Sequence, residues 1–252
     1  MAAEQTTAIV LRTIEFSETS LIVTLLTRDF GQVSAIAKGA RRPKSSFEGS
    51  LDLLAVCRVV LIRKSSDALD LLTEAKLIRR FRGAEKSLDR VYAGYYIAEM
   101  LRLLTDNHDP HPGLYDLSLE ALGLIDGGGN AALAVLGFDV AALRLLGHAP
   151  STRICVDCGN GVPRDRRVAF APIGGGVVCA ECRSRQQSII PISGKSVEQL
   201  EQISAPHSKL PISVDPDSYK ELRNVLNRYM QALLGVLPRM QSFLPARMDP
   251  TR

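Results

Sequence analysis

The chain has 252 residues, 46% of them hydrophobic and 23% charged, which excludes a disordered protein and allows two or more domains with real cores. The formal net charge is +4. Its distribution is uneven, because residues 1–82 hold 13 Lys and Arg against 9 Asp and Glu, whereas residues 83–252 hold 18 of each. A surplus confined to the first third favours nucleic acid as a partner over a membrane surface, since no long basic amphipathic helix accompanies it.

Localisation follows from what the chain does not contain. No basic-then-apolar leader opens it, and its richest apolar stretch, residues 131–147, is interrupted by Asp139 and Arg144. The start of the chain therefore predicts no signal peptide, and the interrupted apolar stretch predicts no membrane span. We therefore expect a cytoplasmic protein with no membrane partner.

Residues 6–76 have the pattern of a small all-β unit. Short β-prone segments with two-residue alternation are separated by polar or glycine-containing turns. The expected strands are residues 7–11, 21–26, 32–37, 53–62 and 69–73. Five strands in this length predict a small closed barrel, for which an OB-fold is the natural candidate and an SH3-like barrel an alternative.

A basic loop separates the third and fourth expected strands. Residues 38–46 read KGARRPKSS, so that Lys38, Arg41, Arg42 and Lys44 fall within seven residues. The glycine relaxes the backbone and the proline removes an amide donor, which together rule out a regular helix. The loop is therefore a candidate site for gripping a polyanion.

From residue 84 onward the apolar period becomes helical. The pattern predicts helices over residues 84–104 and 114–125, and a third helix from an Asn130 N-cap to residue 146. Ser196 and Gln199 resemble a capping box for a fourth helix. Asp215 followed by a proline predicts the start of a fifth, which Pro238 should end.

Four of the five cysteines form two closely spaced pairs. Cys155 and Cys158 are followed after 20 residues by Cys179 and Cys182. This is the spacing of a four-thiolate zinc site, in which each short turn brings two sulfurs to one side. A closed site of this kind has no open position for substrate, so we expect one structural Zn²⁺ per chain. Disulfides are disfavoured in a cytoplasmic chain, and Cys57 reads as a buried small hydrophobe.

Other polar groupings do not combine into a catalytic site. His108, Asp109 and His111 lie in a proline-interrupted stretch that reads as a surface loop. Two runs of three glycines, residues 127–129 and 174–176, lack the surroundings of a phosphate loop and read as turns. No nucleophile elbow is present. We therefore predict that the chain is not an enzyme; a metal-dependent nuclease or deaminase would need an open metal site.

Several stretches together resemble the RecO family of bacterial recombination mediators. They are AIVLRT at 8–13, ETSLIV at 18–23, TRDFG at 27–31, KGARRPK at 38–44, FDVAALRLLG at 138–147, and the first cysteine pair with its following glycine. They cover nearly the whole chain in the family's order. The resemblance implies an OB-fold domain, a helical domain and, as in many members, a zinc module.

The same resemblance implies a function in DNA repair and homologous recombination. Members of the family bind single- and double-stranded DNA and anneal complementary strands. With RecR they help to load RecA on DNA coated by single-strand binding protein, whose C-terminal tail they contact, and RecF is an indirect partner. Carried over by position, Lys38, Arg41, Arg42 and Lys44 fall in the family's basic DNA-binding loop, and the four paired cysteines match its zinc ligands. A nucleoid-associated protein is implied.

The expected architecture is therefore a multidomain α+β protein. Residues 1–82 form an OB-fold DNA-binding domain, residues 83–150 and 191–252 a mainly helical domain, and residues 151–190 an inserted Cys₄ module. The leading hypothesis is a DNA-annealing mediator without an active site. The alternative is a zinc-ribbon scaffold that acts mainly through protein–protein contacts.

Overall fold

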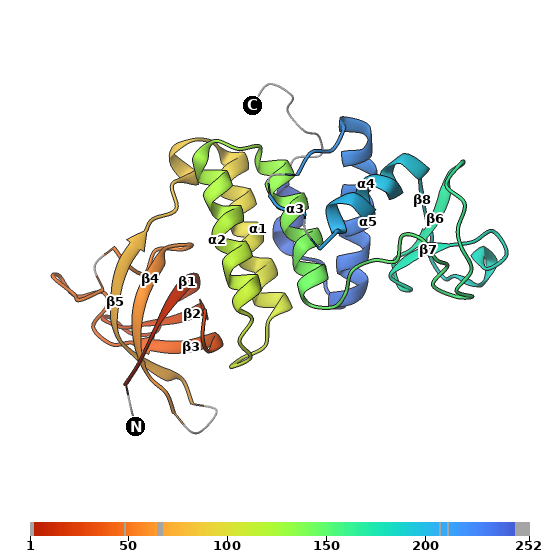
Figure 1. Ribbon diagram of the computed structural model, residues 1–252. Coiled ribbons are helices and arrows are strands. Elements are labelled where there is room, and N and C mark those ends of the chain that lie inside the picture. Colours follow the sequence, from red (N-terminus) through yellow and green to blue (C-terminus); the bar gives the residue numbers. More distant parts are fainter. Residues whose placement is uncertain (1–2, 48, 65–67, 207, 211, 245–252) are drawn as a thin grey trace. The chain divides into compact units, whose positions relative to one another are not determined.

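The computed structural model describes residues 3–47, 49–64, 68–206, 208–210 and 212–244 (Figure 1). The chain divides into two compact units, residues 1–122 and 123–252. None of the described helices is long and apolar enough to cross a lipid bilayer. The finer division into three domains stays a prediction.

The first unit is built on a closed five-stranded barrel. Its strands are β1 (Ala3–Glu15), β2 (Leu21–Thr27), β3 (Gly31–Ala37), β4 (Val56–Ile62) and β5 (Asp70–Arg79). They close in the order β1-β2-β3-β5-β4, with β3 and β5 parallel and the other neighbours antiparallel. The exchange of the last two strands is the Greek-key arrangement of an OB-fold, so the OB-fold prediction is confirmed over the SH3-like alternative.

Alternating apolar and polar residues along the strands place the apolar side chains inside the barrel. In β3 every second residue is buried, and Val33, Ala35 and Ala37 point into the core. Several strand boundaries differ from the predicted ones. β1 extends over Ala3–Glu15 instead of residues 7–11. β5 continues to Arg79 instead of residue 73, and β4 begins at Val56 because residues 52–55 form a turn in which Leu54 has φ 65°.

Helices complete the first unit. α1 (Leu88–Leu104) begins later than predicted, because Ser87 is its N-cap and accepts a hydrogen bond from the Arg90 N–H. A short 3₁₀ turn, η1 (Gly83–Glu85), precedes it, and α2 (Pro112–Gly127) follows, of which the residues up to Leu122 belong to the first unit. The buried face of α1, which includes Tyr96 and Met100, contains few polar atoms, and the helix contacts β1.

The second unit packs helices α3 (Ala131–Leu145), α4 (Gly194–Ser204) and α5 (Pro216–Leu234), with a final 3₁₀ turn η3 (Arg239–Phe243). The predicted caps at Asn130 and Asp215 are confirmed, since each carboxyl or amide oxygen accepts a hydrogen bond from an N–H in the first turn.

Two predicted helix ends are wrong. α4 is capped by Ser193, not Ser196, because Ser196 already lies in the first turn and donates its N–H to the Ser193 hydroxyl. α5 ends before Pro238, because Gly235 takes the left-handed conformation (φ 67°) and terminates the helix first.

A three-stranded antiparallel sheet accompanies these helices. It consists of β6 (Val168–Ala171), β7 (Gly176–Val178) and β8 (Ile190–Ile192), in the order β7-β6-β8, with the 3₁₀ turn η2 (Arg183–Arg185) between β7 and β8. The sheet is fastened to α5 through Phe170, whose ring meets the Tyr229 ring edge-on at 6.1 Å between centroids.

Candidate nucleic-acid interface and metal centre

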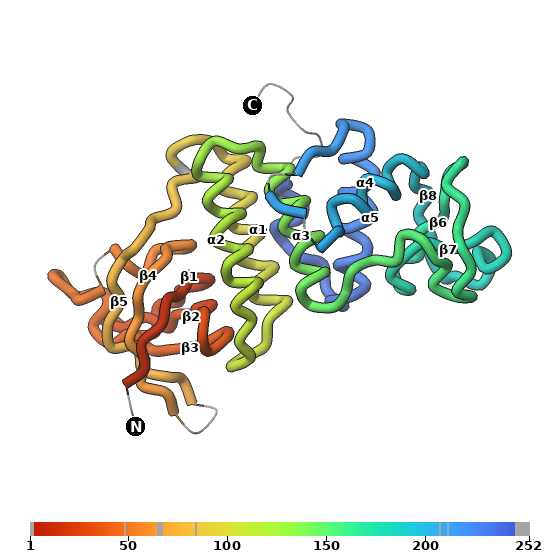
Figure 2. Tube along the Cα trace, in the orientation of Figure 1, coloured from red at the N-terminus to blue at the C-terminus, as the bar shows by residue number. Residues whose placement is uncertain are grey.

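The basic loop is a compact series of turns between β3 and β4. Gly39 has φ 73°, a conformation that favours glycine, and its carbonyl accepts a hydrogen bond from the Arg42 N–H at 3.0 Å. The Arg42 carbonyl in turn accepts from the Ser45 N–H at 3.2 Å. The chain trace extends beyond the strands at this point (Figure 2). The prediction of a non-helical loop is confirmed.

Apolar side chains anchor this loop to the barrel. Phe47 and Leu51 are buried in the barrel core directly after the basic residues. Between them, the Ser50 hydroxyl donates to the Ala75 carbonyl of β5 at 2.9 Å. The loop is therefore held at its C-terminal side by core packing, and its cations are presented on a fixed support.

Cys57 strengthens the same anchor. It is fully buried, as predicted, and its thiol donates to the Ser50 carbonyl at 2.8 Å. Burial, with a contribution from the nearby Asp52 carboxylate, raises the pKa of the Cys57 thiol to about 11. At neutral pH the thiol stays protonated, which suits its role as a hydrogen-bond donor.

The four cationic side chains of the loop are all exposed, but they are not equivalent. Arg41 is tied to the turn between β1 and β2. Its N–H donates to the Thr19 carbonyl at 3.0 Å, and its guanidinium lies 3.1 Å from the Glu15 carboxylate and 3.4 Å from the Ser17 carbonyl. Lys38, Arg42 and Lys44 make no ion pair with any described residue. These three therefore have charges available to a ligand.

The loop forms one wall of an open groove of about 460 Å³. The groove is lined by Thr13, Leu21, residues 40–45, Phe47, Gly49 and residues 51–53. The acid in this wall, Asp52, is paired with Arg80 at 3.5 Å, so its charge is partly offset. The β1–β2 turn holds Arg41 beside this groove through Glu15. That contact was not predictable from the sequence, because it depends on the strand register that places Glu15 opposite Leu21.

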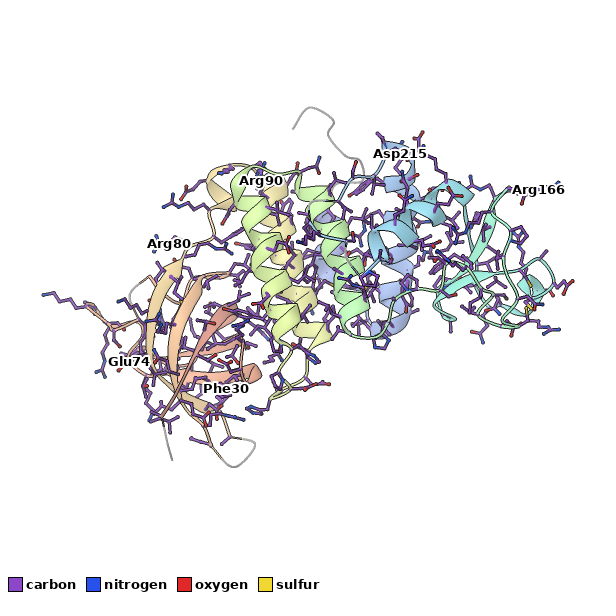
Figure 3. All side chains as sticks on the ribbon, viewed as in Figure 1. Phe30, Glu74, Arg80, Arg90, Arg166 and Asp215 are labelled. Atoms are coloured by element: carbon purple, nitrogen blue, oxygen red, sulfur yellow. The ribbon has the colours of Figure 1, made fainter. Side chains whose placement is uncertain are left out.

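The four paired cysteines converge in the second unit, as their spacing predicted. Their sulfur atoms all lie within 4.8 Å of one another, and yellow sulfur atoms gather beside β6 and β7 in Figure 3. Cys155 and Cys158 occupy a tight turn in which the Gly159 N–H donates to the Cys155 carbonyl at 2.9 Å, with Gly159 at φ 75°. Cys179 follows β7, and Cys182 precedes η2.

These sulfur positions fit a tetrahedral metal ion. A zinc–sulfur bond of about 2.3 Å requires sulfurs roughly 3.8 Å apart, and the Cys158 and Cys179 sulfurs are 3.7 Å apart. A disulfide would need about 2.05 Å, so these cysteines are thiols. The cluster can hold one metal ion.

The surroundings of Cys155 favour the thiolate that a metal binds. Burial opposes its ionisation, but the backbone N–H groups of Cys179, Cys158 and Asp157 outweigh burial and lower the pKa of the Cys155 thiol to about 6.

The histidine-containing loop does not form a second metal site. His111 Nε2 lies 3.1 Å from the Asp109 carboxylate, whereas His108 Nδ1 lies 3.2 Å from the Arg63 guanidinium. The two imidazoles thus have separate partners, and all three residues lie at the surface or close to it. The surface-loop prediction is confirmed.

The fold and these sites define a class: an α+β protein with an OB-fold barrel that carries an exposed basic loop, and a second unit that carries a four-cysteine cluster able to hold a metal ion.

Comparison with known proteins narrows this class. A family model described as "Recombination protein O N terminal" matches residues 1–81, and one described as "Recombination protein O C terminal" matches residues 85–242. The chain is 51% identical to the DNA repair protein RecO of Rhodopirellula baltica, with 96% of this chain and 99% of the relative covered. It is 34% identical to RecO of Anaeromyxobacter sp. (91% and 90% covered) and 32% identical to RecO of Rubrobacter xylanophilus (92% and 91%). The chain therefore belongs to the RecO family of DNA repair proteins.

Proposed function

We propose that this chain is a non-enzymatic mediator of DNA repair and recombination, which binds DNA through the basic loop and anneals complementary strands. The observation that supports the proposal most directly is the set of exposed, unpaired cations Lys38, Arg42 and Lys44 on a loop anchored in an OB-fold barrel. Arg41 contributes less free charge, since Glu15 neutralises it, and it fixes the loop against the β1–β2 turn.

The chemistry of annealing suits such a surface. Two strands can pair when the repulsion between their phosphates is reduced and their base edges stay free. Lysine and arginine contacts to phosphate position a strand without reading its sequence. Aromatic residues make up only 5% of the chain, and this also favours annealing, because stacking at about 1–3 kcal/mol per base would hold unpaired bases.

The salt dependence of single-strand binding tests the loop. We expect the variant K38A/R42A/K44A to flatten the slope of log affinity against log salt by roughly 2, at about 0.7 per lost phosphate contact. Adding R41A should bring the change to at most about 3. The matched control K209A/K220A/R228A removes three exposed charges elsewhere and should leave the slope nearly unchanged. An unchanged slope in the loop variant would place DNA binding on another surface.

We propose further that the four cysteines hold one structural Zn²⁺ per chain. Four thiolates complete a tetrahedral shell and leave no position for water or substrate. Metal analysis of the purified protein should find about one zinc per chain, and the variant C155S/C182S should contain almost none. Purified protein without metal, in which the β6–β8 sheet is nevertheless folded, would contradict the assignment.

The wider assembly is proposed from the family. The chain would act in the cytoplasm, close to the nucleoid. It would bind RecR and the C-terminal tail of single-strand binding protein. Through these partners it would lead indirectly to RecA loading, in a pathway that includes RecF. Co-purification with RecR, and a gain in RecA filament formation on coated single strands, are the expected results. No such gain at saturating RecR would contradict this part of the proposal.

A further inference from the structure

The four-cysteine module is rich in arginine. Residues 151–190 contain six arginines and no lysine, against three acidic residues. Ion pairs with carboxylates far away in the sequence occupy four of these arginines: Arg153 and Arg164 bind Glu201, Arg167 binds Glu221, and Arg185 binds Asp157. Those four serve the fold. Of the other two, Arg166 has only a 3.8 Å contact with its sequence neighbour Asp165, and Arg183 makes no ion pair with a described residue.

The two remaining arginines line the same groove. They lie 17 positions apart in the sequence, yet both border an open cavity of about 480 Å³. Its other walls are largely apolar, formed by Val162, Pro163, Val168, Ala169, Val178 and Ala180. We call this cavity the arginine groove. Its volume falls within the range of small-ligand sites, roughly 300–1,000 Å³.

Arg166 is presented by a segment that is clamped on both sides. On one side Arg164 donates to the Thr152 carbonyl at 3.0 Å and pairs with Glu201. On the other side Arg167 donates to the Pro191 carbonyl at 3.1 Å and pairs with Glu221 at 2.9 Å. Arg166 itself, labelled in Figure 3, is 89% exposed. Its backbone is therefore fixed while its charge faces solvent.

Arg183 is placed by the metal centre. It directly follows Cys182 and opens η2, whose turn is closed by the hydrogen bond from the Arg185 N–H to the Cys182 carbonyl at 3.1 Å. Arg183 is exposed and makes no ion pair within the described part of the chain. A metal bound by the cysteines would thus fix the position of this second arginine.

Negative groups near the groove limit what it can bind. Asp165 lines it and lies 3.8 Å from Arg166, but both are highly exposed, so this pair contributes little. Glu181 is exposed nearby in the sequence, and Cys179 also lines the groove. The lining retains three arginines against one aspartate. Such a site selects a ligand that arginine forks can hold at two points, which is the geometry of phosphate oxygens.

We propose that the arginine groove is a second phosphodiester-binding site for single-stranded DNA, with Arg166 and Arg183 on the phosphates and the apolar walls against sugar and base. This inference rests on the proposed DNA-binding function and adds a second contact on the other unit of the chain. Two contacts on one chain raise the effective concentration of a strand at each site.

Salt titration with an oligo(dT) strand tests this site. In the K38A/R42A/K44A background, adding R166A/R183A should weaken the residual binding and flatten its salt slope by about a further 1.4, for two phosphate contacts at about 0.7 each. Adding K209A/R228A instead, which removes the same charge from exposed positions, should leave binding unchanged. The metal content of R166A/R183A should equal that of the parent, which shows that the module is folded. Residual binding equal to that of the control would overturn the inference.

Photocrosslinking separates failure of this site from failure of the loop. Oligo(dT) containing 4-thiothymidine should crosslink to peptides from residues 162–183 and to peptides from the basic loop. Crosslinks at the loop alone would overturn the inference and leave the proposed function intact, whereas crosslinks at the module alone would support the groove and reject the loop. If R166A/R183A loses binding of an oligo-glutamate peptide while oligo(dT) binding is unchanged, the groove belongs to an acidic protein segment and the inference is wrong.

Discussion

At the scale of single residues, Gly31 shows how one position allows the barrel to contact the loop between α1 and α2. It is the first residue of β3, directly after the β2–β3 turn, with φ 69°, and a Cβ there would clash with the Asp109 backbone. The same neighbourhood includes the hydrogen bond from the His108 N–H to the Gln32 carbonyl at 3.0 Å. Only glycine allows the loop before α2 to approach this closely.

We therefore expect G31A to destabilise the first unit by about 2 kcal/mol or more, from backbone strain of about 1–3 kcal/mol and the displaced loop. G39A is the matched control, because Gly39 has a similar φ of 73° but the nearest atom to its Cβ would be 3.6 Å away. Urea unfolding should show a clearly smaller loss for G39A. Equal losses would mean that the backbone conformation alone, and not the close approach, sets the cost.

Among the loop cations, the structure distinguishes one residue that is tied to a neighbouring turn from three residues without an ion pair to any described residue. Arg41 bridges the loop to the β1–β2 turn through Glu15, whereas Lys38, Arg42 and Lys44 face solvent. The sequence placed all four in one basic run but could not separate them, because Glu15 lies 26 positions away. That distinction came from strand register and the folded loop.

At the scale of elements, a buried ion pair joins α3 to α5. Arg223 Nη2 lies 2.6 Å from the Asp139 carboxylate, and the side chains are 6% and 0% exposed. In the sequence Asp139 only interrupted an apolar helix. Its burial required a partner from another helix, which no local pattern identifies.

Breaking this pair from one side should be costly. We expect D139A to destabilise the second unit by about 3–5 kcal/mol, because it leaves the arginine charge buried without its carboxylate. The double variant D139L/R223M should recover much of that loss, since it removes both charges together. Chemical denaturation of the three proteins checks this. A double variant no more stable than D139A would contradict it.

Acid should loosen the contact between the module and α4. Hydrogen bonds from Arg153, and then Arg164, hold the pKa of Glu201 below its usual range. The stabilisation from a lowered carboxylate pKa is complete above the unfolded value, near 4.3, and is lost as the pH falls through the folded value. Thermal melts of wild type and E201Q between pH 7 and 3 should therefore converge at the acid end. A constant difference between them at every pH would exclude this contribution of the carboxylate.

Helix ends show where local sequence reasoning succeeds and where it fails. Asn130 and Asp215 were predictable as caps, because each stands alone before its apolar face. Ser193 was missed because Ser196 offered a competing cap three residues later, and the choice depends on Glu221, which accepts hydrogen bonds from the Ser193 N–H and the Ser196 hydroxyl. Tertiary contacts decided between two locally acceptable starts.

At the scale of the whole molecule, the barrel and the cysteine module were predictable because their signals are periodic or fixed in spacing. The arginine groove was not. The net charge of residues 83–252 is zero, because the positive charge of the arginine-rich residues 151–190 is cancelled by an excess of acidic residues in the rest of this region. Which arginines the fold uses, and which it leaves to solvent, emerged only from their carboxylate partners.

Removing metal should act on one unit. We expect a chelator to unfold the β6–β8 sheet and to leave the barrel intact, because the cysteines and the sheet share one small core while the barrel has its own. Hydrogen exchange should show faster exchange at residues 168–178 and unchanged protection in β2 and β3. Parallel loss of protection in both regions would show that the metal stabilises more than its own module.

The most direct test of the central proposal is the annealing rate of complementary strands that are first coated with single-strand binding protein. Wild-type protein should accelerate annealing, K38A/R42A/K44A should lose most of the acceleration, and K209A/K220A/R228A should retain it. If wild-type protein gives no acceleration, or if the loop variant anneals as fast as wild type, the basic loop is not the annealing surface, and a scaffold that acts through protein contacts becomes the better account.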